Sequence, residues 1–299
     1  MFIRLFILII TPLLISAQVF VEQGRFGGKG SENGKLNNPQ ALAISKEKII
    51  YVVDTGNHRI QLFDLSGMFI RSVGGFGFKD DQFDSPRDIW LDSIIDIYVA
   101  DYNNRRVQRY DRSMNFLNSF YSNEGEDVDF QFSEVASCAV SSQNDLFILD
   151  HDEYKIVKFK RDGSAERSFG RFETGQNELE YPEQLELWGA DKLLVTDSAL
   201  KTVFIYDLFG TFIQKIESDL FEHPMGMEVD IQDNIYVADP EARKIIFIDQ
   251  KLENISEISF PQRFRSPRDI AVLTSARQRT LFVIDGDEIV VGQMQTEKQ

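Results

Sequence analysis

The 299-residue sequence predicts an all-β fold, a six-bladed β-propeller built from four-stranded antiparallel blades. Three observations lead to this prediction. Residues 39–74 contain four short apolar runs separated by turn-forming residues, two marker residues recur every 42 to 49 positions, and a large apolar residue precedes each first marker by three positions. A period of this length with four strands per unit is typical of a propeller blade, whereas a helical solenoid would show a 3.6-residue spacing.

The first unit shows the pattern of one blade. Its apolar or β-branched runs, 41–44, 49–53, 60–63 and 68–73, have the length and composition of strands. The segments between them contain Lys46-Glu47, Thr55-Gly56-Asn57 and Leu65-Ser66-Gly67. These are residues that form tight turns between antiparallel strands, so we expect one four-stranded sheet.

Marker residues extend this sheet to six copies. A proline, which suits the first residue of a strand because it lacks an N–H, is expected to begin each first strand; the positions are Pro39, Pro86, Val135, Pro182, Pro224 and Pro267. An aspartate closes each second strand: Asp54, Asp101, Asp150, Asp197, Asp239 and Asp285. The preceding large side chains are interpreted as wedges between blades: Leu36, Phe83, Phe132, Leu179, Phe221 and Phe264.

The segment Asp54-Thr55-Gly56-Asn57-His58-Arg59-Ile60 resembles the motif of the NHL repeat, and Tyr102-Asn103-Asn104-Arg105-Arg106-Val107 is similar to it. Later units depart from the motif, since Glu153, Leu200 and Ala242 replace the asparagine. The resemblance implies a six-bladed NHL-type propeller and a role as a binding platform.

Both ends of the chain carry further signals. Residues 1–17 have one charge, an apolar core and small residues at Ser16 and Ala17, which predicts a secretory signal peptide, with a signal anchor as the alternative. The mature N-terminal segment has the register of a fourth strand, and the last unit provides only three. We therefore expect residues 18–293 to form one propeller whose ring is closed by the N-terminal strand, followed by a disordered tail at 294–299.

Composition limits the partners. The chain has 32 Lys and Arg residues against 48 Asp and Glu residues, a net charge of −16, which argues against nucleic-acid binding through phosphates and against binding to anionic membranes. We expect a secreted monomer whose partner is a basic or neutral protein or peptide. The single cysteine, Cys138, is interpreted as a buried hydrophobe, with an intermolecular disulfide as the alternative. Asn254 heads a glycosylation sequon expected in the outermost strand of blade five.

Candidate binding residues cluster where first strands begin and second strands end, because these segments meet around the axis of a propeller. They are Arg87, Asp88, His151, Glu183, His223, Arg268 and Asp269. Two interpretations of these charges stay open: an Arg–carboxylate ring that holds the blades together, or a set that contacts a ligand.

Two enzymatic alternatives, a Zn²⁺-dependent lyase and a Ca²⁺-dependent hydrolase, each require residues that the sequence does not clearly provide. The segment Pro-Arg-Asp-Ile resembles one found in peptidyl-hydroxyglycine amidating lyases, which implies a Zn²⁺ site of three histidines, and the chain has three: His58, His151 and His223. His58 belongs to the repeat motif, however, and one cysteine cannot form the disulfides of those lyases. A Ca²⁺-dependent propeller hydrolase would need converging oxygen ligands, whereas the acidic runs here follow single loops. We therefore expect a secreted interaction module without a catalytic set or a cofactor, and a Zn²⁺- or Ca²⁺-dependent enzyme is the alternative. A cytoplasmic RNA-binding role would require residues 1–17 not to be a leader.

Overall fold

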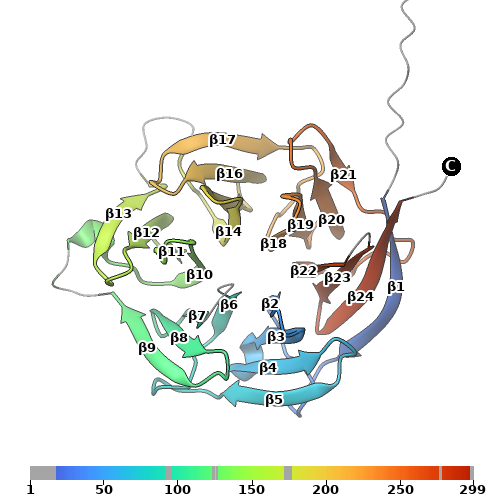
Figure 1. The fold of residues 1–299 in the computed structure, drawn as a ribbon, viewed down its shortest axis with the longest axis horizontal. Coiled ribbons are helices and arrows are strands. Elements are labelled where there is room, and N and C mark those ends of the chain that lie inside the picture. Colours follow the sequence, from blue (N-terminus) through green and yellow to red (C-terminus); the bar gives the residue numbers. More distant parts are fainter. Residues whose placement is uncertain are drawn as a thin grey trace, which may run out of the picture.

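The computed structural model describes residues 18–91, 96–122, 125, 127–171, 177–275 and 278–296. These residues form six four-stranded antiparallel sheets arranged as blades around a central axis (Figure 1). The predicted six-bladed propeller is confirmed. The expected leader, residues 1–17, lies outside the described residues. Within the described part of the chain, no helix has the length and hydropathy of a membrane span.

Each blade contributes one strand to the ring around the axis and one to the outer rim. The innermost strands are β2 (Ala41–Ile44), β6 (Pro86–Leu91), β10 (Val135–Val140), β14 (Pro182–Trp188), β18 (Met227–Val229) and β22 (Pro267–Ser275). The second strands are β3 (Ile49–Asp54), β7 (Asp96–Asp101), β11 (Leu146–Asp150), β15 (Lys192–Asp197), β19 (Ile235–Asp239) and β23 (Gln278–Asp285).

The two outer layers follow the same order. The third strands are β4 (Arg59–Asp64), β8 (Arg106–Asp111), β12 (Lys155–Phe159), β16 (Thr202–Asp207), β20 (Lys244–Ile248) and β24 (Glu288–Thr296). The outermost strands are β5 (Phe69–Gly74), β9 (Phe116–Tyr121), β13 (Ala165–Phe169), β17 (Phe212–Glu217), β21 (Ile255–Glu257) and β1 (Gln18–Gly27). Two single turns of 3₁₀-helix, η1 (Thr55–Asn57) and η2 (Val128–Phe130), lie in the connections.

The predicted markers hold with one correction. All six second strands end at the marker aspartate, and β6, β10, β14 and β22 begin at the proline position. In blades 1 and 5 the strand begins two or three residues later. The chain is already paired there, since Gln40 N donates to Val53 O and Met225 N to Ala238 O, but the segments are too irregular to count as strand. Gly67, Gly163 and Gly210 take φ of about +80° in the turns before the outermost strands, which is the reason for glycine there.

The hydrophobic core is divided among the interfaces between blades. Each of six buried clusters joins side chains of two neighbouring blades, and each contains one predicted wedge that is at most 4% exposed: Leu36, Phe83, Phe132, Leu179, Phe221 and Phe264. Burial of one such side chain contributes about 1.5–3 kcal/mol. The blades are therefore held together by apolar contacts along the whole ring.

The ring is closed as expected, by β1 pairing antiparallel with β24 (Figure 1). Phe20 is 1% exposed and packs edge-on against Phe260 of the neighbouring blade, with ring centroids 4.9 Å apart. One expectation for the tail is wrong, because residues 294–296 belong to β24 and pair with Gln18–Phe20. The outer strand β1 provides partners for three residues that the polar sequence alone did not place in a sheet.

Two single residues can now be placed. Cys138 is fully buried in β10, and burial raises the pKa of its thiol, as a structural cysteine requires. Asn254 lies one residue before β21, in the turn that follows β20, and not in the strand itself. Its side-chain Nδ2 donates to Asp249 Oδ2 at 2.6 Å, a contact that orders this turn.

Candidate functional site

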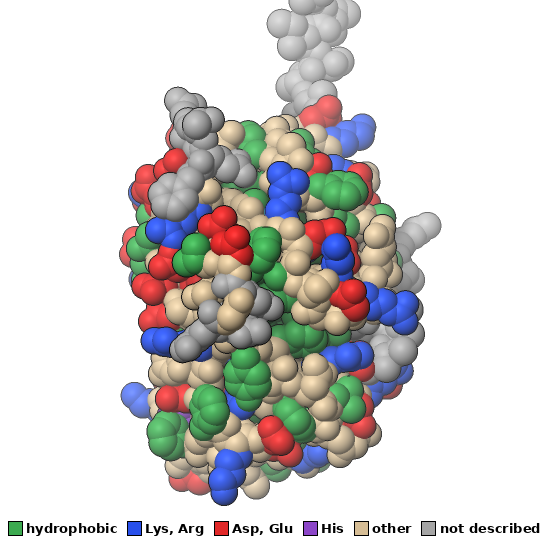
Figure 2. Space-filling model, turned by 90° about the vertical axis from the view of Figure 1, so that its left-hand side faces the viewer, with side chains coloured by type: hydrophobic (Ala, Val, Ile, Leu, Met, Phe, Trp, Pro, Cys, Tyr) green, Lys and Arg blue, Asp and Glu red, His purple; other side chains and the backbone are tan. Residues whose placement is uncertain are grey.

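The two faces of the disc differ in what they expose around the axis. The upper face carries the segments that lead into the innermost strands and the turns between second and third strands, such as 37–40 and 55–58. The lower face carries the remaining turns, such as 45–48 and 65–68. Seen from the side of blades 2 and 3, the rim shows acidic, basic and hydrophobic side chains interspersed (Figure 2). A further cavity opens at the centre of the upper face.

This cavity, the axial pocket, has a volume of about 320 Å³. It is lined by the same repeat position of all six blades, the residue after the proline marker: Gln40, Arg87, Ala136, Glu183, Met225 and Arg268. Asp88, Tyr181, Gln184, His223 and Gly226 complete the wall. The backbone of this position is repeated in all six blades, but its side chains are of five kinds, with arginine in blades 2 and 6. The pocket is therefore chemically asymmetric on a nearly symmetric frame.

A β-bulge explains why this position faces the axis. In blades 2, 3, 4 and 6 the pairing of the first strand with the second skips one residue: Arg87, Ala136, Glu183 and Arg268. Such a bulge leaves one residue unpaired and re-aims its side chain. The bulged residue and the one after it both reach the axial cavity, as Arg87 with Asp88 and Glu183 with Gln184 show.

The residues after the bulge form the floor of the pocket and join neighbouring blades. Asp88 Oδ2 accepts from Ser137 Oγ at 2.5 Å and from Cys138 N at 3.3 Å. Ser137 Oγ accepts from Leu185 N at 3.0 Å. Gln184 Oε1 accepts from Met227 N at 2.5 Å. In each case the side chain of one blade binds the backbone amide at the third position after the proline marker of the next blade.

The same link closes the ring, since Asp269 Oδ2 accepts from Leu42 N at 2.8 Å. Gln184 Nε2 lies 3.5 Å from Asp88 Oδ1 and 3.4 Å from Asp269 Oδ1, so it bridges the two carboxylates across the axis. Asp88 and Asp269 therefore hold blades together through backbone amides and neutral side chains. The expected Arg–carboxylate ring is not what the structure shows.

Two predicted residues, His151 and Asp269, lie outside the pocket lining. His151 is 6% exposed; its Nδ1 lies 3.0 Å from Pro182 O, and its ring contacts Tyr181 edge-on at 4.4 Å. Asp269 lies beneath the floor and is 1% exposed. His151 thus supports the pocket wall by packing behind Tyr181.

The two arginines of the pocket are held by contacts other than ion pairs. The guanidinium of Arg87 lies 3.7 Å above the ring of Tyr102, whose hydroxyl donates to Glu134. Arg268 Nη1 donates to Asn38 Oδ1, and burial lowers the pKa of Arg268 from its ordinary value. Neither arginine forms an ion pair with a carboxylate of the described residues.

The acidic group in the pocket wall is already paired. Glu183 Oε1 accepts from Ser198 Oγ at 3.0 Å and lies 3.5 Å from His223 Nε2. The hydrogen bond to Glu183 raises the pKa of His223. The pocket therefore contains one Glu–His pair and two guanidiniums that form no ion pair with the described residues, although the charge of Asp287 partly opposes the effect of burial on the pKa of Arg268.

A smaller cavity of about 130 Å³ lies on the axis below the floor. It is lined by Asp88, Glu186, Glu228 and Asp269 together with apolar residues of the innermost strands. Burial raises the pKa of all four carboxyls, to about 8 for Glu228. Burial disfavours the ionised form, and the carboxyls raise one another's pKa, so part of this set is protonated at neutral pH.

Comparison with known proteins identifies the scaffold. The family model for the NHL repeat matches residues 36–63, which span the wedge, the first two strands and the third strand of blade 1. Blade 1 thus contains an NHL repeat, and the six blades form the propeller that the NHL resemblance implies. It is 29% identical over 122 residues to Protein brain tumor of Drosophila melanogaster and 27% identical over 103 residues to E3 ubiquitin-protein ligase NHLRC1 of Homo sapiens. These matches cover 40% and 34% of the chain, but only 12% and 26% of the two relatives.

Solved structures with the same fold align with nearly the whole chain. A streptogramin B lyase structure aligns over 94% of this chain and 98% of its own, with a TM-score of 0.63 and 13% identity. Virginiamycin B lyase from Staphylococcus aureus aligns over 94% and 100%, with a TM-score of 0.61 and 12% identity. At this identity the likeness shows the architecture alone.

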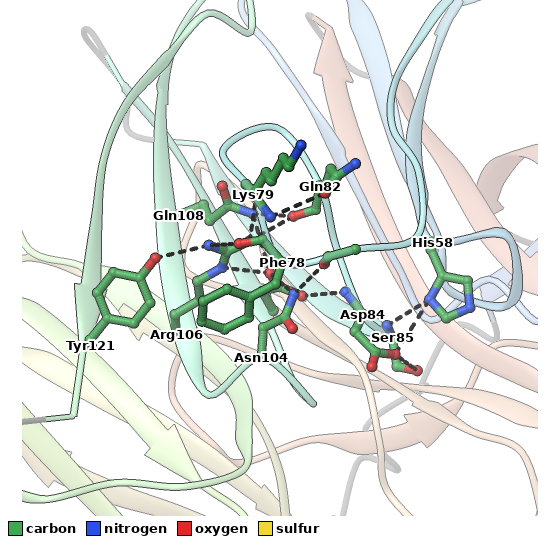
Figure 3. A network of polar contacts seen from close by, with 12 residues as sticks. His58, Phe78, Lys79, Gln82, Asp84, Ser85, Asn104, Arg106, Gln108 and Tyr121 are labelled. Atoms are coloured by element: carbon green, nitrogen blue, oxygen red, sulfur yellow. Dashed lines mark hydrogen bonds and ion pairs between the residues drawn. The ribbon is translucent and has the colours of Figure 1, made fainter.

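The NHL motif itself is a structural network away from the pocket (Figure 3). In blade 2, Arg106 is fully buried and donates to Asp101 Oδ2 at 2.8 Å, to Tyr121 Oη and to three carbonyl oxygens of the loop that precedes the blade, those of Phe78, Lys79 and Gln82. Asn104 and Gln108 donate to the same carboxylate. In blade 1, Arg59, Asn57 and Gln61 repeat these contacts with Asp54. The motif thus fastens the loop between consecutive blades.

The three histidines of the NHL propeller lie at three different interfaces. His58 Nδ1 accepts from Ser85 N at 3.0 Å and lies beside Asp84 (Figure 3), whereas His151 packs on Tyr181 and His223 pairs with Glu183. Across the described ranges, no group of three or more His, Cys, Asp or Glu side chains is placed to hold one metal ion. The number of histidines suggested a Zn²⁺ lyase, but their positions among the described residues do not form one metal site.

Sequence reasoning found the pocket face but missed several of its residues. Gln40 and Tyr181 line the cavity, Gln184 and Ser137 form its floor, and Tyr102 supports Arg87. Listing the first and second positions after each proline marker would have found Gln40, Ser137 and Gln184. No sequence signal distinguishes Tyr102 and Tyr181 from other exposed aromatic residues.

Proposed function

We propose that this NHL-repeat propeller is an interaction module that binds a peptide segment of a protein partner in the axial pocket. The observation that carries the proposal is the pocket itself: six equivalent backbone positions present five kinds of side chain around one cavity, with arginine at two of them. The repeated residues of the blades stabilise the fold, so the side chains at this one position can differ between blades and recognise a ligand. The relatives named above, which are much longer proteins, are consistent with an interaction role for such propellers.

Exposed aromatic and apolar side chains on the upper face fit this role. Tyr181, on the pocket wall, is 42% exposed, and Tyr154, on a neighbouring turn, is 40% exposed. Aromatic side chains supply contact area at low conformational cost and are common anchors in binding sites. A peptide that enters the pocket would be able to contact this rim as well.

Selection from a displayed peptide library tests the proposal. The wild-type chain is compared with Met225→Trp, which fills the pocket, and with Ile231→Trp on the lower face of the same blade, where Ile231 is 83% exposed. We expect wild type and Ile231→Trp to enrich one consensus and Met225→Trp to lose it. Enrichment that is unchanged by Met225→Trp, or no enrichment by any protein, would contradict pocket binding.

A second candidate is an enzyme, because the His223–Glu183 pair lies in the pocket wall and the raised pKa of His223 suits a general acid or base. A metal-dependent lyase or a Ca²⁺-dependent hydrolase would bind its ion with ligands that the described residues do not bring together. Elemental analysis of the purified protein for Zn²⁺ and Ca²⁺, followed by a substrate screen with His223→Gln as the inactive control, distinguishes this candidate from a binding module.

We also propose that the protein is a secreted monomer. The support is the leader-like sequence at 1–17, and the position of Asn254 in a half-exposed turn is compatible with glycosylation. Expression in a eukaryotic secretory system would show an N-terminus at Gln18 and a mass shift that glycosidase treatment and Asn254→Gln both remove. Retention of the protein in the cytosol would contradict secretion.

A further inference from the structure

The arginines of the axial pocket are exceptional within this chain. Every other arginine of the described residues that is buried or half-buried forms an ion pair with a carboxylate: Arg25, Arg59, Arg106, Arg109 and Arg279. Arg87 and Arg268 are half-buried and form none with the described residues. In a chain with 48 acidic against 32 basic residues, two unpaired guanidiniums in one cavity need an explanation.

The two carboxylates that line the pocket, Glu183 and Asp88, are occupied. Glu183 is bound to Ser198 and His223, and both oxygens of Asp88 accept from neighbouring blades or from Gln184. Folding therefore leaves two guanidiniums in the pocket that no carboxylate of the lining pairs with, although the whole chain is negative and Asp287 acts on Arg268 from outside the lining. A half-buried guanidinium gains more from an anionic partner than a fully solvated one, because less water screens the pair.

We propose that the axial pocket binds a single carboxylate of a peptide ligand, held between Arg87 and Arg268. This carboxylate comes from the C-terminus of the peptide or from an Asp or Glu side chain. The proposal rests on the peptide-binding function above and specifies its chemistry. It also revises the basic or neutral partner expected from net charge, because the two arginines of the pocket have no carboxylate partner in its lining.

The geometry of each arginine prepares it for this role. The face of Arg87 stacks on Tyr102, which leaves the edge of the guanidinium, where its N–H donors lie, free to meet a planar acceptor. Arg268 is oriented by Asn38 through one N–H, and its remaining donors form no hydrogen bond with the described residues. Arg–carboxylate pairs are commonly bidentate, so two fixed forks select a planar anion by shape and by charge.

The rest of the pocket limits the ligand to one acidic group. Met225 and the exposed ring of Tyr181 provide apolar contacts next to the arginines, whereas the net charge of −16 repels a polyanion. We therefore expect one carboxylate next to an apolar or aromatic residue. A nucleic acid does not meet this description.

The test uses small probes that do not depend on the peptide library. N-acetyl-tyrosine and N-acetyl-tyrosine amide differ only in the carboxylate. Arginine side-chain N–H resonances of the full-length protein are followed by NMR while each probe is added. We expect the acid to shift the Arg87 and Arg268 signals in a saturable manner and the amide to bind at least tenfold more weakly.

Matched variants locate the effect. Arg87→Gln and Arg268→Gln should each weaken binding of the acid about tenfold or more, and Arg161→Gln, which removes an exposed arginine from a lower-face turn, should not. Thermal unfolding of each variant checks that it is folded. Equal binding of acid and amide, or wild-type binding of the acid by the folded double variant, overturns the proposal.

Peptides from the library extend the test to the source of the carboxylate. Each selected peptide is measured as the free acid, as the C-terminal amide, and with its Asp or Glu changed to Asn or Gln. Loss with the amide assigns the C-terminus, and loss with the neutral side chain assigns the acidic residue; loss with neither overturns the proposal. If the small acid binds at the arginines but the library yields no peptide, carboxylate recognition stands and the peptide-binding function fails.

Discussion

Replacement of Arg106 by methionine tests how strongly the NHL motif stabilises the propeller. Arg106 is 0% exposed and makes hydrogen bonds to one carboxylate, one tyrosine hydroxyl and three backbone carbonyls (Figure 3). Methionine fills much of the space but removes the donor of three carbonyls and the ion-pair partner of Asp101, which keeps only the neutral donors Asn104, Gln108 and Asp84 N. Removal of one partner of a buried ion pair costs about 3–5 kcal/mol, because the remaining charge stays buried.

This cost can be measured by equilibrium urea unfolding and by calorimetry. A loss of that size should lower the midpoint of thermal unfolding by roughly 6–20 °C, since about 1 kcal/mol corresponds to roughly 2–4 °C in a domain of this order of size. Arg106→Lys should recover part of the loss, because it keeps the charge but not the planar fork.

Blade 3 offers the matched control. There Lys155 replaces the motif arginine, and its one hydrogen bond to the described residues is to Val128 O, at 3.3 Å, while the charge of Asp150 also acts on it. Lys155→Met should cost about 1–2 kcal/mol, in line with one hydrogen bond to a charged donor. If Arg106→Met and Lys155→Met destabilised the protein equally, the network would not be the source of stability that its geometry indicates.

Two further predictions concern the axis and the seam. Burial raises the pKa of Glu228 to about 8, so its neutral form is favoured in the folded state and stability is lost as the pH rises from about 4.5, its unfolded value, to about 8. Glu228→Gln should therefore raise the free energy of unfolding at pH 8 by roughly 1–3 kcal/mol, below the limit of about 5 kcal/mol set by that difference, and should have little effect at pH 4; an equal effect at both pH values in urea titrations would refute the assignment. Phe20→Ala should cost about 3–5 kcal/mol, because the ring is 1% exposed and packs against Phe260 and Phe264; a calorimetric scan that matches wild type would show that β1 does not hold the ring closed.

The sequence was sufficient for the architecture because the fold is repeated. One aspartate per blade ends a second strand, and one wedge per blade is buried, so an error in a single unit is corrected by the other five. The last unit contains only three strand-like segments. This likewise indicated that the N-terminal segment supplies its fourth strand. Residues 294–296 were misassigned because their pairing with β1 depends on a partner far away in the chain.

The pocket could be predicted only in part, since its chemistry depends on geometry that no local pattern encodes. The bulge after the proline marker turns two consecutive residues toward the axis, against the alternation expected of a strand. Consequently Arg87 and Asp88 look like one charged pair in the sequence but have different roles. Asp88 binds backbone amides of the next blade, whereas Arg87 stacks on an aromatic ring.

The pairing of β1 with β24 has a consequence for how the protein folds. Arg25 and Glu288, which meet at this seam, are 263 residues apart. β1 is synthesised long before its partner β24. Until β24 is complete, β1 has no strand to pair with and its apolar side chains stay exposed to water. Bringing such distant segments together costs about 5 kcal/mol of chain entropy, and long-range pairing of this kind is slow. We therefore expect the ring to close late, in one cooperative step. Chains that are still incomplete would expose unpaired strand edges, to which neighbouring molecules can add strands.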